Sequence, residues 1–317
     1  MVFKNKSLSF SDCGVPLRRH TRQPRDRTPG QLRIIKGRES KRGAWPWQAS
    51  VSLQLLHPNY GLIGHWCGGV LVHPLWLLTT AHCIHNELFN LPLPALWTAV
   101  LGEWDRAEQK GAYVPIEKIV LHHRFHNYQH DIALMKLTRP ADVSKSSRIR
   151  TICLPPFEPP IANFEVEPGN DYKVNINRSD KKLMFGEEID PFIDDNNRLD
   201  FKDECYATGW GREQTNGNLT DVLLEAEVPV LPLHICRDRY SLTLPLNEGH
   251  LCAGSTDGST GACVGDSGGP LQCRTGGRWE LRGLTSFGSG CARRGVPDVY
   301  TNVAHYVTWI YAHVYAS

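Results

Sequence analysis

Short apolar runs bounded by turn-forming residues dominate the chain from Trp45 onward. Such runs, with Gly, Pro, Asn or Asp at or near their bounds, cover residues 47–56, 68–81, 113–121, 131–137, 225–231, 279–287 and 298–303. Runs of this length and spacing are typical of strands in an all-β sandwich or barrel. The last segment has apolar side chains at helical spacing and predicts a C-terminal helix: Val303, Val307, Ile310 and Val314.

Two polar segments flank or interrupt this β pattern. Residues 1–33 carry eight Lys or Arg against two Asp and contain three prolines, which predicts an extended basic leader. Residues 155–204 carry thirteen Asp or Glu against six Lys or Arg without periodicity, which predicts an acidic surface insertion. We therefore expect a leader, 1–33, followed by a main domain, 34–317, that holds the insertion.

Charge and hydropathy exclude two classes of partner. The formal net charge of +2 over 317 residues is too small to favour nucleic acid. No run of eighteen apolar residues occurs, so the sequence predicts no membrane span.

Cysteine usage indicates an oxidising compartment. Ten cysteines without a Cys-x-x-Cys pair favour five disulfides over zinc or thioredoxin-like chemistry. Three N-x-S/T sequons, at Asn5, Asn177 and Asn218, are compatible with secretion, although such short matches are frequent by chance. The first residues lack the apolar run of a signal peptide. We expect a secreted, extracellular protein whose sequence begins inside a longer precursor or at a misassigned start.

Three motifs supply the groups that peptide hydrolysis by a serine needs. "LTTAHC" contains His82, "HDIALMKL" contains Asp131 and "GDSGGP" contains Ser267. A serine nucleophile requires a base that takes its proton and an acid that orients the base. Each motif alone is weak, because an isolated histidine or glycine-rich turn is often structural. All three in this order are specific.

In these residues and their order, the chain resembles the trypsin/chymotrypsin family of serine proteases over residues 34–317 minus the insertion. The resemblance implies an all-β fold of two packed six-stranded antiparallel barrels with a C-terminal helix. It implies Ser267 as nucleophile, His82 as general base and then acid, and Asp131 as the group that orients the imidazole. Backbone N–H groups of Gly265 and Ser267 would form the oxyanion hole.

The resemblance also implies how the cysteines pair. It gives Cys67–Cys83, Cys205–Cys273, Cys236–Cys252 and Cys263–Cys291 within the protease domain, with Cys13–Cys153 tethering the leader as a light chain.

The same family matures by cleavage before a motif that corresponds here to "IIKG". Cleavage after Arg33 would free the Ile34 amine, which would be buried against Asp266 as an ammonium–carboxylate pair. Lys36 stands where the family has glycine. We therefore expect a zymogen that an upstream protease activates. The alternative is that this basic site is a chance match.

The family's substrate pocket maps onto residues near Ser267. Ser286 matches the serine that supports the catalytic aspartate, and Gly288 leaves the pocket mouth open. The position that carries an aspartate in trypsin-like members is Gly261, followed by Ala262, whereas Asp298 replaces a glycine of the opposite wall. A carboxylate at the floor predicts cleavage after Lys or Arg. The alternative is an elastase-like preference for small residues, with Asp298 turned away.

Metal and cofactor signals are weak. We expect no cofactor and no metal, since the histidines of the segment before Asp131 match no standard zinc spacing: His122, His123, His126 and His130. Calcium near Glu103 and Glu108, where some family members bind it, stays an open alternative.

The function we expect is that of a secreted serine endopeptidase acting through an acyl-enzyme. Its partners would be protein substrates, an activating protease and protein protease inhibitors. The alternative from another class is a catalytically weak homologue that acts as a binding cofactor, and a metal-dependent hydrolase is a distant third.

Overall fold

The computed structural model describes residues 13–18, 37–57, 61–85, 90–156, 204–212, 217–258, 260–289 and 293–314. Four expectations from the sequence concern residues outside these ranges: the cleavage site at Arg33 and Ile34, the cysteine Cys291, most of the leader (1–12 and 19–33) and most of the insertion (157–203).

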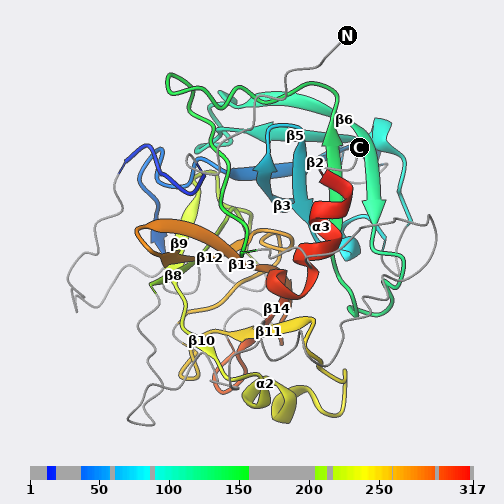
Figure 1. The fold of residues 1–317 in the computed structure, drawn as a ribbon, viewed down its shortest axis with the longest axis vertical. Coiled ribbons are helices and arrows are strands. Elements are labelled where there is room, and N and C mark those ends of the chain that lie inside the picture. The colour runs from blue at the N-terminus through cyan, green and yellow to red at the C-terminus, as the bar shows by residue number, and fades with distance from the viewer. Residues whose placement is uncertain are drawn as a thin grey trace, which may run out of the picture. The chain divides into compact units, whose positions relative to one another are not determined.

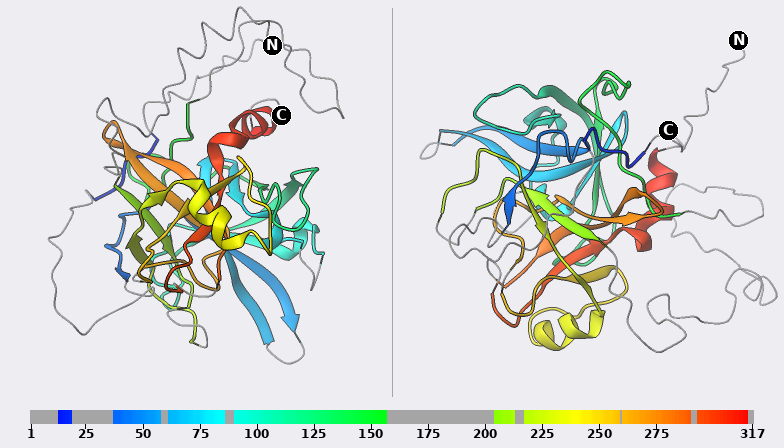
Figure 2. Two further views of the ribbon diagram at one scale, coloured as in Figure 1. Left: turned by 90° about the horizontal axis from the view of Figure 1, so that it is seen from below. Right: turned by 90° about the vertical axis from the view of Figure 1, so that its left-hand side faces the viewer.

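Six antiparallel strands close into the first barrel (Figure 1). In spatial order they are β2 (Gln48–His57), β3 (Gly61–His73), β4 (Trp76–Thr79), β7 (Ala133–Leu137), β6 (Ala112–Leu121) and β5 (Trp97–Leu101), which follows the 3₁₀ turn η3 (Pro94–Leu96). Inward-facing aliphatic side chains such as Leu71, Leu77 and Leu101 fill the barrel. The β2–β3 hairpin extends outward in the left-hand view of Figure 2.

A second sheet contains the remaining strands. Its order is β1 (Arg38–Glu39), β9 (Leu224–Glu227), β8 (Cys205–Gly209), β12 (Pro270–Thr275), β13 (Arg278–Phe287), β14 (Asp298–Asn302), β11 (His250–Ala253) and β10 (Val230–Leu231). The strands β9 and β10 are two pieces of one segment, interrupted next to Pro229, which lacks the N–H that a ladder needs. Because β10 ends the order and β9 is separated from the other end only by β1, the sheet curls back toward its starting segment as a half-barrel, which we call the second barrel.

The C-terminal segment packs at the junction of the barrels. It begins as the 3₁₀ helix η4 (Val303–Tyr306) and continues as α3 (Val307–Val314). Its apolar face is buried in one cluster with Trp76 of the first barrel and Leu284 of the second. The predicted fold of two barrels with a C-terminal helix is therefore confirmed. A further helix, α2 (Leu233–Tyr240), escaped the sequence pattern because only Cys236 and Tyr240 are buried in it.

A buried chain of hydrogen bonds joins the two barrels. The Trp47 indole N–H donates to the Gln272 carbonyl oxygen at 2.6 Å, and the Gln272 amide donates to the Thr208 hydroxyl at 3.0 Å. The Thr208 hydroxyl in turn donates to the Gln48 carbonyl oxygen at 2.7 Å. Gln48 begins β2, whereas Thr208 and Gln272 belong to the second barrel. This network fixes how the barrels dock, because two of its three hydrogen bonds cross from one barrel to the other.

We predict that Gln272→Leu lowers the free energy of unfolding by about 2 kcal/mol, because it leaves the Trp47 N–H buried without an acceptor. Urea unfolding of the disulfide-intact protein measures the change. Gln54→Leu, an exposed position on β2, is the matched control and should change stability little. Equal stability of the two variants would contradict a structural role for the network.

Candidate active site

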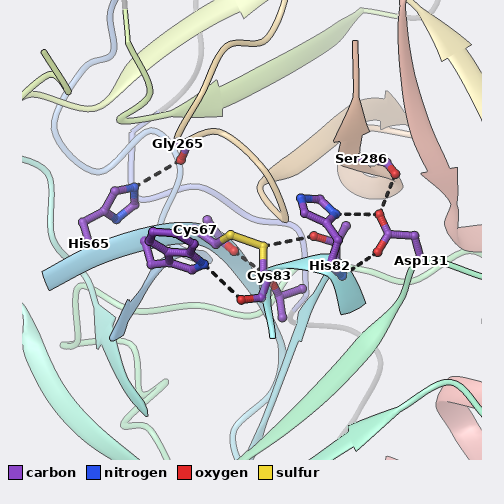
Figure 3. Close-up of a disulfide and its surroundings, with 11 residues drawn as sticks. His65, Cys67, His82, Cys83, Asp131, Gly265 and Ser286 are labelled. Atoms are coloured by element: carbon purple, nitrogen blue, oxygen red, sulfur yellow. Dashed lines mark hydrogen bonds and ion pairs between the residues drawn. A yellow bond between two sulfur atoms is a disulfide. The ribbon is translucent and has the colours of Figure 1, made fainter. Parts of the chain in front are cut away.

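His82 and Asp131 meet at the end of the first barrel (Figure 3). His82 lies in the 3₁₀ turn η2 (Ala81–Cys83), directly after β4, and Asp131 lies two residues before β7. The His82 backbone N–H donates to Asp131 Oδ1 at 2.9 Å, and Nδ1 lies 2.8 Å from Oδ2. Because a carboxylate only accepts, Nδ1 carries the proton. A neutral His82 therefore keeps the lone pair on Nε2, as a general base requires.

The second barrel completes the surroundings of Asp131. The Ser286 hydroxyl of β13 donates to Asp131 Oδ2 at 2.6 Å, and the Thr301 hydroxyl of β14 donates to the Asp131 carbonyl at 2.6 Å. Asp131 is only 2% exposed. Burial alone would raise its pKa, but the His82 charge and the hydrogen bonds from His82 and Ser286 outweigh burial and lower it. The carboxylate is thus held ionised inside the protein.

Backbone hydrogen bonds connect the turn that contains Ser267 to two segments that adjoin this site. The Gly68 N–H donates to the Ser267 carbonyl at 2.7 Å, and the Gly268 N–H donates to the Thr285 carbonyl at 2.8 Å. Gly68 and Thr285 each adjoin a residue already tied to the site, because Cys67 is bonded to Cys83 and Thr285 precedes Ser286. Gly268 has φ +75°, and a Cβ there would lie 2.2 Å from Thr79 Oγ1. The turn after Ser267 therefore needs glycine.

Two hydrogen bonds fix the turn before Ser267, which contains the Gly265 N–H expected in the oxyanion hole. The Val264 carbonyl accepts the Arg212 N–H at 2.8 Å. A trans peptide points its C=O and N–H in opposite directions, so the Gly265 N–H faces away from Arg212. The Gly265 carbonyl accepts a hydrogen bond from His65 Nε2 at 3.2 Å.

Sequence reasoning missed His65 as a contributor to this turn. Its Nε2 donates to Gly265, so Nδ1 accepts from the Ser50 hydroxyl at 2.6 Å. Burial and the charge of Arg106 lower the pKa of His65 to about 4, against the opposing hydrogen bond to Gly265. The His65 imidazole is therefore uncharged at neutral pH and supports the Gly265 turn through its hydrogen bond. Its only sequence signal is its place two residues before Cys67 in a strand.

Asp266 is buried beneath the same turn. Its Oδ1 accepts the Gly211 N–H at 2.8 Å and its Oδ2 accepts the Cys263 N–H at 2.9 Å. Burial raises its pKa from 3.8 to about 6, although the two hydrogen bonds oppose the rise. Glycine is required at 211, because a Cβ there would lie 2.5 Å from the Asp266 carboxylate. The Ile34 amine expected to pair with Asp266 lies outside the described residues.

Asp298 lies against the segment that carries Gly261. Its Oδ2 accepts the Ala262 N–H at 2.7 Å, and the residue is 3% exposed. Burial raises its pKa from 3.8 to about 7, with a smaller contribution from Asp266. Gly288, expected at the pocket mouth, is exposed. The residues predicted for the pocket floor are thus brought together, with a carboxyl group that ionises near neutral pH.

The two carboxylates considered for calcium have protein partners. The two Glu103 carboxylate oxygens accept the N–H groups of Trp104 and Gly111 at 3.0 and 2.7 Å. Glu108 is paired with Arg42 at 2.6 Å and Lys110 at 3.3 Å.

The histidine rings of the segment before Asp131 pack against one another and against aromatic side chains. His122 stacks against His123 and His130, and its ring contacts Tyr306 and Trp309. Within the described part of the chain, no group of three or more His, Cys, Asp or Glu side chains is arranged to hold a metal ion.

Four of the disulfides expected from the resemblance are formed between described residues: Cys13–Cys153, Cys67–Cys83, Cys205–Cys273 and Cys236–Cys252. Cys263 is also disulfide-bonded, and its expected partner Cys291 lies outside the described residues. The Cys13–Cys153 disulfide holds the described part of the leader against the domain. There the Gly14 N–H donates to the Thr151 carbonyl, and the Gly14 carbonyl accepts the Trp279 N–H.

Comparison with known proteins agrees with the fold. The family model described as Trypsin matches residues 34–167 and 165–310. The chain therefore belongs to the trypsin family, a class of serine-type endopeptidases that need no cofactor for their chemistry.

Three relatives share the printed name Transmembrane protease serine 7. The protein of Mus musculus is 33% identical over 287 residues, that of Rattus norvegicus 31% over 292, and that of Homo sapiens 32% over 287. The alignments cover 89–90% of this chain and 28–29% of the relatives. The chain therefore spans less than a third of their length.

These relatives overturn one expectation. The sequence predicted a secreted protein, but the relatives that match nearly the whole chain are named transmembrane proteases. The prediction rested on cysteines and sequons, which report an oxidising compartment and do not distinguish a free protein from an anchored one. Among the described residues, no helix has both the length and the apolar composition needed to cross a membrane.

We predict that the uncleaved chain, made as Arg33→Gln, loses stability as pH rises from 4 toward 7. The Asp266 pKa is higher in the folded protein than in the unfolded one, so the unfolded chain releases its proton first and rising pH favours unfolding. The shift from 3.8 to about 6 corresponds to about 3 kcal/mol.

Urea unfolding at a series of pH values measures this slope. Asp266→Asn in the same background should flatten it, because the amide does not ionise. An unchanged slope in that variant would show that Asp266 is not buried as a raised-pKa carboxyl group.

Proposed function

We propose that the chain is the catalytic domain of a serine endopeptidase that hydrolyses protein substrates through an acyl-enzyme on Ser267. The observation that carries the proposal is the buried Asp131 carboxylate, which receives two N–H groups of His82 and the hydroxyl of Ser286. This arrangement leaves Nε2 of His82 as a base, and we infer that it faces Ser267. The turn that contains Ser267 is hydrogen-bonded to Gly68 and, through Gly268, to Thr285.

Each step of the reaction uses one of these groups. His82 Nε2 removes the proton from the Ser267 hydroxyl as its oxygen attacks the substrate carbonyl carbon. The N–H groups of Gly265 and Ser267 receive the oxyanion, and Asp131 stabilises the imidazolium. His82 then gives its proton to the leaving amine. A water activated by His82 hydrolyses the acyl-enzyme and regenerates Ser267.

Activation would follow cleavage after Arg33 by another protease. Asp266 supports this part of the proposal, because a buried carboxyl group with a pKa raised to about 6 gains free energy from a cationic partner. The new Ile34 ammonium would supply that partner and order the Gly265 turn. The bond between Cys13 and Cys153 would keep the cleaved leader attached as a light chain. Protein protease inhibitors are further expected partners.

We predict that Asp131→Asn lowers kcat by about 10⁴-fold in protein cut after Arg33. The asparagine amide would donate to Nδ1 and move the proton to Nε2, which could then no longer accept the Ser267 proton. Hydrolysis of a randomised peptide library and of a selected substrate measures the effect. Asp238→Asn, on the exposed side of α2, is the matched control and should retain full activity.

Ser267→Ala should abolish turnover in the same assay. Absence of turnover in the unsubstituted cut protein would contradict the proposal and favour the homologue that binds partners without catalysis.

The proposed specificity is for Lys or Arg before the cleaved bond. Its support is the hydrogen bond from Ala262 to Asp298, which places the carboxyl group against the residue after Gly261 rather than away from it. Gly261 has no side chain that could cover the carboxylate. A compact ammonium group suits a buried carboxylate of this kind.

We predict that the preference for Lys over norleucine, taken as the ratio of kcat/KM values, rises with pH through about 7. Asp298 ionises there in the free enzyme, so the carboxylate that attracts Lys is present above this pH and lost below it. The ratio cancels the effects of pH on the shared catalytic step, because both substrates require the same base. Paired peptides that differ only at this residue measure it.

Asp298→Asn should lower the ratio roughly 10- to 100-fold at pH 8 and remove its pH dependence. A pH-independent ratio in the unsubstituted enzyme, with cleavage after Ala or Val, would instead establish an elastase-like pocket.

A further inference from the structure

One sequence motif has no part in the proposed chemistry. Asn218-Leu219-Thr220 is an N-glycosylation sequon, which needs a hydroxyl side chain two residues after the asparagine. Asn218 is exposed and precedes the segment in which Leu219 bridges to Arg212. Of the three sequons in the chain, it is the one whose asparagine lies among the described residues.

The backbone after Asn218 is clamped to the oxyanion turn. The Thr220 N–H donates to the Trp210 carbonyl at 3.1 Å, while the Arg212 N–H donates to the Val264 carbonyl at 2.8 Å. A Cβ on Gly265 would lie 2.5 Å from Cδ2 of Leu219. Asn218 therefore stands one residue from a side chain that covers Gly265, at the rim of the proposed site.

The side-chain hydroxyl of Thr220 is unfavourable for the stability of the folded protein. Its Oγ1 is buried and has no hydrogen-bond partner among the described residues. A buried hydroxyl without a partner destabilises a protein, and valine has the same shape without the hydroxyl. N-glycosylation requires this hydroxyl while the chain is still unfolded, before folding buries it.

We propose that Asn218 carries an N-linked glycan that shields the Gly265 side of the active site from large molecules. In the transfer, a lipid-linked oligosaccharide pyrophosphate loses its C1–oxygen bond to phosphate. A C1–Nδ2 bond to Asn218 forms, and one Nδ2 proton is released. The disulfides place the chain in the oxidising compartment where such donors act. The exposed position leaves room for the sugar.

Glycan mapping in a single-sequon chain tests the site. The full chain, expressed behind an added signal peptide with Asn5→Gln and Asn177→Gln, should show a mass shift that peptide N-glycosidase removes. That enzyme should convert Asn218 to aspartate. Asn218→Gln and Thr220→Val should abolish the shift, whereas the matched control Thr220→Ser should retain it. An unmodified Asn218 in the single-sequon chain would overturn the proposal.

A stability comparison separates the sequon from a structural role for Thr220. In an Asn218→Gln background, which carries no glycan at this site, Thr220→Val should leave the Tm unchanged or raise it. A fall of more than about 3 °C would show that the fold uses the hydroxyl, and would remove this line of support.

The shielding role rests on the proposed protease function and has its own assay. In protein cut after Arg33, Asn218→Gln should increase the rate constant for inactivation by a protein inhibitor several-fold. The kcat/KM for a short peptide should stay unchanged. Equal inactivation rates would overturn the shielding role. Absence of any turnover would count against the protease function alone, because the mapping does not depend on activity.

Discussion

The carboxylate of Asp131 is the constraint on which the rest of the site depends. A buried charge is tolerated only when donors surround it, and the donors here come from both barrels. His82, in the turn after β4, and Ser286, in β13, both bond the carboxylate, while Thr301 of β14 donates to the Asp131 backbone carbonyl. The barrels must therefore dock correctly before the Asp131 carboxylate receives all of its hydrogen bonds. The polar chain from Trp47 to Gln48 holds the same junction at a second place.

Two other buried carboxyl groups differ from Asp131 in their partners. Asp131 faces an imidazole and a hydroxyl, and its pKa is lowered. Asp266 and Asp298 accept only backbone N–H groups among their described hydrogen bonds, and burial raises their pKa values to about 6 and about 7. Each would gain free energy from an added cation. We relate the first to the amine released on activation and the second to a basic substrate side chain.

Much of this arrangement could be predicted from the sequence. The short apolar runs predicted the strands, and the motifs around His82, Asp131 and Ser267 predicted which residues would form the site. The pattern could not reveal His65, because a histidine in a strand has no signal until Gly265 is folded against it. It could not show that Asp298 turns toward Ala262, which depends on the pairing of β11 with β14. The secreted location was wrong, because disulfides and sequons report a compartment and not an anchor.

The reactivity of Ser267 toward a serine-directed covalent inhibitor tests the central claim most directly. We would measure the labelling rate in protein left intact at Arg33, in protein cut there, and in cut Ser267→Ala. The account predicts rapid labelling that appears on cleavage, maps to Ser267 and is absent from the alanine variant. Equally slow labelling of cut and intact protein would contradict a catalytic Ser267–His82–Asp131 site. Equally rapid labelling of both would leave the site but contradict its activation by cleavage.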